Sequence, residues 1–213
     1  KALLGKTISY GWASAMQQAT VQLGKLGIQA IVNSMGVAIA AAFAVVNRID
    51  DFAYTPEQNI GHAMTALMAQ SKGAGKKSRL KEAFRCGMRI EMVYGVIIFI
   101  ICFVFANPLM RLFTSDTDVC RHGVTYLGLI SIMYLLPAAT NGIQGYFRGI
   151  GDLKITLISS FVNMGVRVIA AAILVFAFSL QIEALPYSYL AGWIGMLIAE
   201  LPLLIRSYRN YDK

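Results

Sequence analysis

One stretch of the sequence places acids, an arginine and amides inside a long apolar run. Asn47, Asp51, Tyr54, Gln58 and His62 recur every three or four residues, which puts them on one face of a helix. Ionisable side chains at membrane depth are costly, and they commonly line a water-filled cavity or an ion path. The spacing therefore predicts a polar stripe that serves a small molecule or an ion.

The charged residues of the same stretch are the strongest candidates for an ion path. Arg48, Asp50 and Asp51 fall near the middle of the apolar run, and Glu57 directly follows Pro56. A proline inside a helix leaves carbonyl groups without a donor, and such carbonyls could hydrate an ion beside Glu57. For the two aspartates, an ion relay and simple charge neutralisation by Arg48 are equally good interpretations.

Polar side chains in two other apolar segments extend the set of substrate or ion-path candidates. Gln17 and Gln18 lie near the middle of the first segment. In the fourth segment a second stripe contains Tyr134, Asn141, Gln144 and Arg148, at spacings of seven, three and four that share one helical face.

Arg167 and Glu200 lie near the middle of the fifth and sixth apolar segments. Either charge alone in hydrocarbon would cost several kcal/mol. We therefore expect a buried ion pair between them, with a structural role.

Catalytic chemistry is not indicated by the sequence. Cys86, Cys102 and Cys120 lie far apart, without the spacing of a metal site or a disulfide framework. No nucleophile stands with a base and an orienting group, so neither an enzyme nor a bound cofactor is expected.

The composition is that of an integral membrane protein. Of the 213 residues, 57% are hydrophobic and 14% are charged, and the mean hydropathy is +0.59. The net charge of +8 lies mostly in connections between apolar runs, which indicates membrane topology rather than a nucleic-acid partner. Membrane lipids are the expected surroundings.

The apolar runs predict an all-α bundle of six transmembrane helices, since each span needs about 20 residues. The expected spans cover residues 7–33, 37–70, 88–113, 122–145, 155–180 and 187–205. Pro56 predicts a kink near residues 52–55 of the second span. Residues 72–87 predict a basic amphipathic connection that lies on the cytoplasmic membrane surface.

The basic residues predict the orientation. By the positive-inside rule both ends of the chain are cytoplasmic, in a multi-pass protein of the cell (plasma) membrane. Arg111 and Arg121 alone fall on the outer side, and the expected inner side has the remaining basic residues outside the spans: Lys1, Lys6, Lys72, Lys76, Lys77, Arg79, Lys81, Arg85, Arg89, Arg148, Lys154, Arg206, Arg209 and Lys213.

The order of several motifs resembles the C-terminal half of transporters of the multidrug and toxic compound extrusion (MATE) family. The resemblance covers nearly the whole chain. It is carried by residues 41–53 with Pro56 and Gly61, the run 68–75, the run 108–113, Tyr126-Leu127, Leu136-Pro137, the run 141–152, Asn163 with Arg167, and Gly192-Trp193.

This resemblance implies a transporter with two lobes of six helices each, of which residues 1–213 would be the C-terminal lobe. The whole protein would export amphipathic, often cationic small molecules by alternating access, in exchange for H⁺ or Na⁺. The N-terminal six-helix lobe is then a partner that this sequence lacks. Gln17 and Gln18 depart from branches of the family that have an acid in the corresponding helix.

Two alternatives stay open at this point. A flippase for lipid-linked oligosaccharides from the same superfamily would need a cleft lined by cations, whereas the second segment holds two aspartates near its middle. A six-helix membrane subunit without transport activity is the other.

Overall fold

The computed structural model describes residues 2–210, and these residues fold into helices without a strand. In chain order the elements are α1 (Ala2–Asn33), α2 (Val37–Gly73), α3 (Lys77–Val104), α4 (Ala106–Arg111), α5 (Thr117–Ser131), α6 (Leu135–Ile150), α7 (Leu153–Ala172), the π-helix η1 (Ile173–Ala177) and α8 (Ala184–Asn210).

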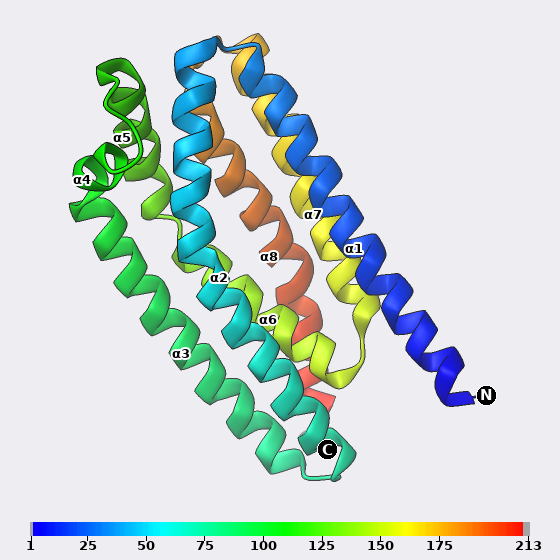
Figure 1. Ribbon diagram of the computed structural model, residues 1–213. Coiled ribbons are helices and arrows are strands. Elements are labelled where there is room, and N and C mark those ends of the chain that lie inside the picture. Colours follow the sequence, from blue (N-terminus) through cyan, green and yellow to red (C-terminus); the bar gives the residue numbers. More distant parts are fainter. Residues whose placement is uncertain (1, 211–213) are drawn as a thin grey trace.

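The helices form two packed groups. In the first group, α2 packs against α3, α5 and α6. In the second, α7 lies between α1 and α8 (Figure 1). Contacts of α5 and α6 with α8, and of α1 with α2, join the two groups. Side chains of α2 that face inward therefore meet those of α5, α6, α7 and α8.

The beginning of α1 and the end of α8 lie at the same end of the bundle (Figure 1). The α2–α3 and α6–α7 turns lie there too, whereas α4 and the start of α5 lie at the opposite end (Figure 1). The basic residues of the expected inner side therefore gather at one end. Lys1 and Lys213 lie outside the described residues, as do the side chains of Lys6 and Lys77.

Pro56 does not end α2, which continues through it to Gly73 as one helix. The ribbon of α2 changes direction about half-way along its length (Figure 1). A bend in this region is what the missing backbone donor of Pro56 produces.

Two expected spans are broken in the structure. The third ends as α3 at Val104, and the short α4 follows after Phe105. The fourth is a pair of helices, α5 and α6, bent by 52°. Pro137 is consistent with this second break, because a proline is accommodated best in the first turn of a helix, and α6 begins two residues before it.

The expected surface connection at residues 72–87 is a turn followed by the first turns of α3, and its place on the membrane surface stays a prediction. Residues 74–76 make a short turn, and α3 begins at Lys77. No proline lies between Lys77 and Met88, and Gly87 is the single glycine there, so the helix can start before the apolar run does. Its first turns pack on the end of α8, where Phe84 and Lys81 both lie against the Tyr208 ring.

By length and apolar character, Ser78–Val104, Leu153–Ala177 and Ala184–Arg209 are the helices of the described chain that could cross a membrane, and α5 with α6 would be a further, broken span. The first two expected spans, residues 7–33 and 37–70, do not meet these criteria of length and apolar character. The layout of six spans stays a prediction for them.

Bare backbone lets the helices approach closely at two points. A methyl group at Gly145 of α6 would lie 2.8 Å from the Gly61 carbonyl oxygen of α2, and one at Gly192 of α8 would lie 2.9 Å from the Asn163 carbonyl oxygen of α7. Both are typical of helix packing in lipid, where small residues allow contact between backbones.

Candidate functional site

Asp50 lies at the junction of the two helix groups. Its side chain is 4% exposed, and it accepts a 2.5 Å hydrogen bond from the Tyr134 hydroxyl. Tyr134 lies at the break between α5 and α6, so the broken span brings this hydroxyl to the aspartate. Arg167 of α7 is within electrostatic range of the same carboxylate.

Aromatic rings surround this carboxylate. Tyr54 packs edge to face on Tyr134, with ring centroids 5.4 Å apart, and it also lies 6.4 Å from Trp193. Tyr189 packs edge to face on Trp193 at 5.7 Å. The hydroxyl of Tyr54 is buried without a hydrogen-bond partner. One polar group beside the Asp50 carboxylate is therefore free to form a hydrogen bond.

The expected ion pair between Arg167 and Glu200 is not formed, and this prediction was wrong. The Arg167 guanidinium lies over the ring of Tyr189, in a cation–π contact. Both Glu200 oxygens are buried without a hydrogen bond, and Arg148 is the cation nearest in its electrostatic surroundings. Equal depth in two spans did not imply contact, since the two side chains point to different neighbours.

Glu57 belongs to a second polar cluster, between α2, α3 and α6. Glu57 and Glu91 are both 0% exposed, and none of their four oxygens has a hydrogen-bond partner. Glu57 is in electrostatic range of Glu91 and lies beside the Asn141 amide. Of the predicted residues, Glu57 and Asn141 are thus brought together.

A third polar group joins α1, α6 and α7. The Gln17 amide donates to Gln144 at 3.2 Å and to the Ser160 hydroxyl at 2.9 Å. Gln144 in turn donates to Ser160 at 3.2 Å. Gln17 and Gln144 were predicted as separate candidates, and the structure places them in one network; Gln18 is exposed and does not join it.

The predicted stripe on α2 lies mostly on its outer face. Asp51, Gln58 and His62 are exposed, while Asn47 and Tyr54 are half-buried. Arg48 is also exposed. The helix therefore has two polar faces: an inner one with Asp50 and Glu57, and an outer one with Asp51.

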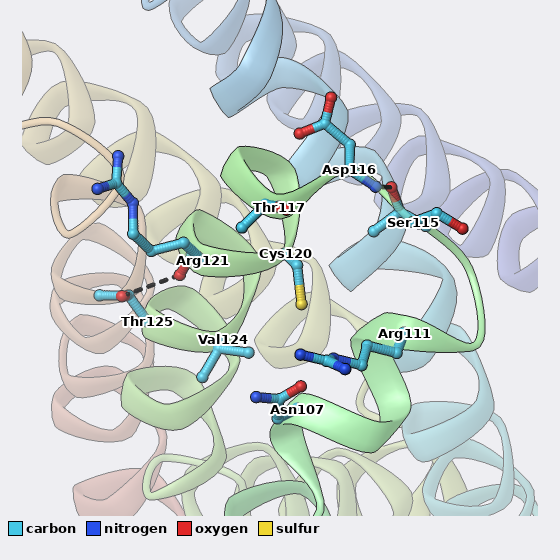
Figure 2. A pocket seen from close by; sticks show the side chains of 10 residues that line it. Asn107, Arg111, Ser115, Asp116, Thr117, Cys120, Arg121, Val124 and Thr125 are labelled. Atoms are coloured by element: carbon cyan, nitrogen blue, oxygen red, sulfur yellow. Dashed lines mark hydrogen bonds between the residues drawn. The ribbon is translucent and has the colours of Figure 1, made fainter.

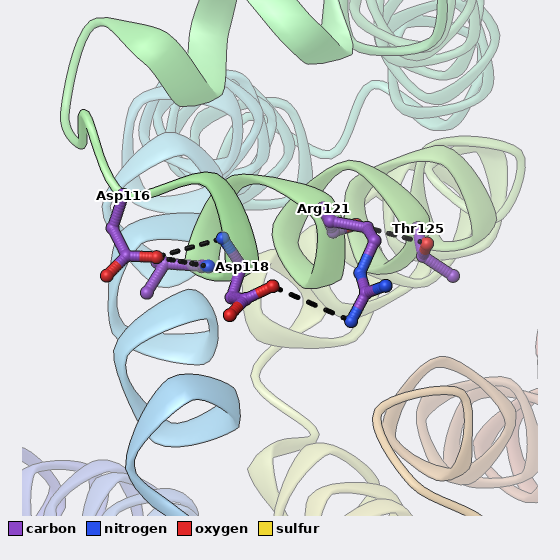
Figure 3. Close-up of polar contacts among 5 residues, drawn as sticks. Asp116, Asp118, Arg121 and Thr125 are labelled. Atoms are coloured by element: carbon purple, nitrogen blue, oxygen red, sulfur yellow. Dashed lines mark hydrogen bonds and ion pairs between the residues drawn. The ribbon is translucent and has the colours of Figure 1, made fainter.

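An open pocket of about 740 Å³ lies at the other end of the bundle, between α4 and α5. Figure 2 shows Arg111, Asn107 and Cys120 facing this space, while Arg121 points away from it. Asp116 caps α5 by accepting from the backbone of Asp118 (Figure 3).

The exposed ion pair at the start of α5 contributes little to stability. Arg121 and Asp118 are 3.7 Å apart, as Figure 3 shows, and both are largely exposed. Surface pairs of this kind contribute about 0–1 kcal/mol.

Glu91, which the structure places in the second cluster, was not among the predicted site residues. A usable signal was nevertheless present: Gly87 and Gly95 flank Glu91 at a spacing of four, and all three are buried on one face of α3. Small residues on both sides of an acid indicate a face that another helix approaches. Ser160, Tyr189 and Trp193 were likewise absent from the predicted site.

A family model places the chain among known proteins. The model named MatE matches residues 13–179. The chain belongs to the MatE family. The resemblance seen in the sequence and the all-α membrane fold are therefore confirmed, and this MatE chain shares its family with transporters rather than enzymes.

Curated relatives and solved structures support the same assignment. The probable multidrug resistance protein YoeA of Bacillus subtilis is 28% identical over 213 residues, which are 100% of this MatE chain and 44% of YoeA. The probable multidrug resistance protein NorM of Thermotoga maritima is 25% identical over 188 residues, 88% of this chain and 39% of that protein.

A crystal structure of MATE in the straight conformation superposes with a TM-score of 0.91 at 17% identity, covering 100% of this chain and 48% of that one. The chain spans less than half the length of each of these relatives.

Proposed function

We propose that this chain is one lobe of an ion-coupled antiporter, which exports amphipathic and often cationic compounds in exchange for H⁺ or Na⁺. Two relatives named as probable multidrug resistance proteins support the kind of substrate. A second lobe of similar size would provide the opposite wall of the transport path. The two lobes would open the path alternately to each side of the membrane.

The outer face of α2 is the observation that carries this proposal. Asp51, Gln58 and His62 are exposed in the middle of a long helix. Charged side chains are too costly to face lipid at that depth, so this face needs water or a protein partner. An aqueous cleft between two lobes provides both, and an aspartate there would attract a cationic substrate.

The orientation belongs to the proposal as well. Both ends of the lobe would lie in the cytoplasm, in the plasma membrane. The basic residues at the end of the bundle that holds the α2–α3 turn and the end of α8 support this orientation.

The test is to replace Asp51 in the full-length protein. With expression matched, Asp51→Asn is expected to reduce the efflux of cationic dyes to nearly the level of cells without the transporter. Asp118→Asn is the control, because Asp118 is an exposed acid away from α2, and it is expected to export normally. Normal efflux by Asp51→Asn would remove this residue from the mechanism.

The assay also separates the rival functions. A flippase would move lipid-linked oligosaccharide but no dye, and a subunit without transport activity would move neither. Arg167 of α7 lies over the Tyr189 ring and does not line the outer face of α2, where one arginine, Arg48, and one acid, Asp51, are exposed.

A further inference from the structure

Three glutamates are completely buried. Two belong to the first helix group, and the third lies on α8. Glu57, Glu91 and Glu200 are each 0% exposed, and none of their carboxylate oxygens has a well-formed hydrogen bond. Asn141 lies beside Glu57, and Ser159 and Gln144 lie beside Glu200. Asp50 differs, because the Tyr134 hydroxyl donates to it. Burying an ionised carboxylate without a partner is among the costliest arrangements in a protein.

Glu57 and Glu91 share one place in the fold, next to Gly61. The Glu91 Oε1 atom lies 3.6 Å from the point where a methyl group of residue 61 would be, and the Arg148 Nη2 atom lies 3.8 Å from the same point. Glu57 precedes Gly61 by one helical turn on the same buried face. The Asn141 carbonyl oxygen is nearer still, 3.3 Å from that methyl position, so α2, α3 and α6 meet in close contact at Gly61.

Too few positively charged side chains lie near Glu57 and Glu91 to neutralise the buried carboxylates. Arg148 is the arginine that faces them, and Arg148 also lies near Glu200. Two tyrosines also lie near these acids, and neither has a positive charge. The Tyr94 hydroxyl is already bonded to the Ala53 carbonyl at 3.1 Å, and Tyr54 lies near Glu57.

The remaining side chains nearby do not supply a counter-charge. His62 adjoins Gly61 in the chain but is exposed on the outer face of α2. Asn141 supplies a neutral amide. One arginine cannot neutralise three carboxylates, so two negative charges are left over in a buried region. Two adjacent carboxylates cannot both stay ionised there without a bound positive charge.

We propose that Glu57 and Glu91 together bind one exchangeable monovalent cation, H⁺ or Na⁺. Carboxylate oxygens suit either cation, because one of them can be protonated and both residues can provide oxygen ligands to Na⁺. The inference rests on the proposed antiport, because it assigns the coupling ion to a site. This site is separate from Asp50 and lies between α2 and α3 rather than on the outer face of α2.

The experiment measures cation binding by the purified full-length protein in nanodiscs. Binding of ²²Na⁺ at alkaline pH tests the sodium form. Infrared titration of the carboxylic acid C=O band without Na⁺ tests the proton form. The double variant Glu57→Gln/Glu91→Gln is compared with Glu82→Gln, in which an exposed acid of the same helix α3 is changed.

The double variant is expected to lose one equivalent of bound ²²Na⁺, or the titrating acid band, and Glu82→Gln is expected to retain it. Thermal unfolding and gel filtration confirm that the variants are folded. If the double variant does not fold, the two single variants replace it, and each is expected to weaken binding of the cation at least tenfold. Unchanged binding in folded variants would overturn the site, and so would a wild-type protein that shows neither signal.

Gradient-driven efflux in proteoliposomes separates this inference from the proposed function. Export driven by a gradient, together with wild-type cation binding by the double variant, would refute the site and leave the antiport standing. Cation binding that depends on Glu57 and Glu91, in a protein that exports nothing under either gradient, would refute the antiport and leave the site standing.

Discussion

At the scale of single residues, the hydrogen bond from Tyr134 to Asp50 joins two positions that are 84 residues apart in the chain. We expect Tyr134→Phe to lower stability by about 1–3 kcal/mol, because it leaves a buried carboxylate without its donor. The measurement is the thermal unfolding midpoint in detergent. The matched control is Tyr187→Phe, in which the ring is 45% exposed and little change is expected.

A double-mutant cycle makes this prediction specific. If the hydrogen bond is the cause, Tyr134→Phe combined with Asp50→Asn costs less than the sum of the two single changes. Additive costs would show that Tyr134 matters through packing on Tyr54 and not through its hydroxyl.

Some of the polar interior could be predicted from the sequence, because an acid in an apolar run is unusual wherever it occurs. Asp50 and Glu57 were found in this way. Their partners could not be found, since Tyr134 and Glu91 reach α2 only through the relative rotation of other helices. Periodicity placed Asp51 on one face with Gln58 and His62, which are all exposed, but it could not tell that Asp50, one position earlier, faces the interior.

At the scale of elements, the contact of α2 with α6 depends on bare backbone at Gly145. A methyl group there would lie 2.8 Å from the Gly61 carbonyl oxygen. We expect Gly145→Ala to destabilise the protein by about 1–3 kcal/mol, the usual cost of overpacking. The reading is again the unfolding midpoint of the purified protein.

Gly165→Ala provides the matched control. Gly165 lies inside α7, and a methyl group at this position would meet nothing within 4 Å. Alanine is better than glycine in a helix interior by about 1 kcal/mol, so this variant is expected to be equally stable or more stable. Equal destabilisation by both alanines would contradict the role of the close approach.

The elements themselves were predictable to different degrees. The apolar runs located the helices, because burial in lipid requires them to be long. The breaks after Val104 and around Ile132 were not predicted, since both fall inside continuous apolar sequence. Pro108 and Pro137 were signals for them, but a proline such as Pro56 is also tolerated within an unbroken helix.

At the scale of the whole molecule, the proposed orientation can be tested with thiol reagents. Cys86 is exposed and lies near the end of the bundle where α2 turns into α3, whereas Asp118 lies at the other end. A membrane-impermeant maleimide is expected to label a single-cysteine Asp118→Cys variant in intact cells. A variant that retains only Cys86 should react in inverted vesicles instead. The reverse pattern would invert the proposed topology.

The polar character of α2 has a consequence for how the protein enters the membrane. The middle of α2 contains Arg48, Asp50, Asp51 and Glu57, and an Asp or Arg at the centre of a helix costs about 2.5–3.5 kcal/mol at the translocon. A helix with such a cost is not expected to move from the translocon into the lipid by itself. Residues 34–36 join α2 to α1 by a short turn, so the two would insert as a hairpin or wait for α3. The acids of α2 therefore make its insertion during synthesis depend on its neighbours.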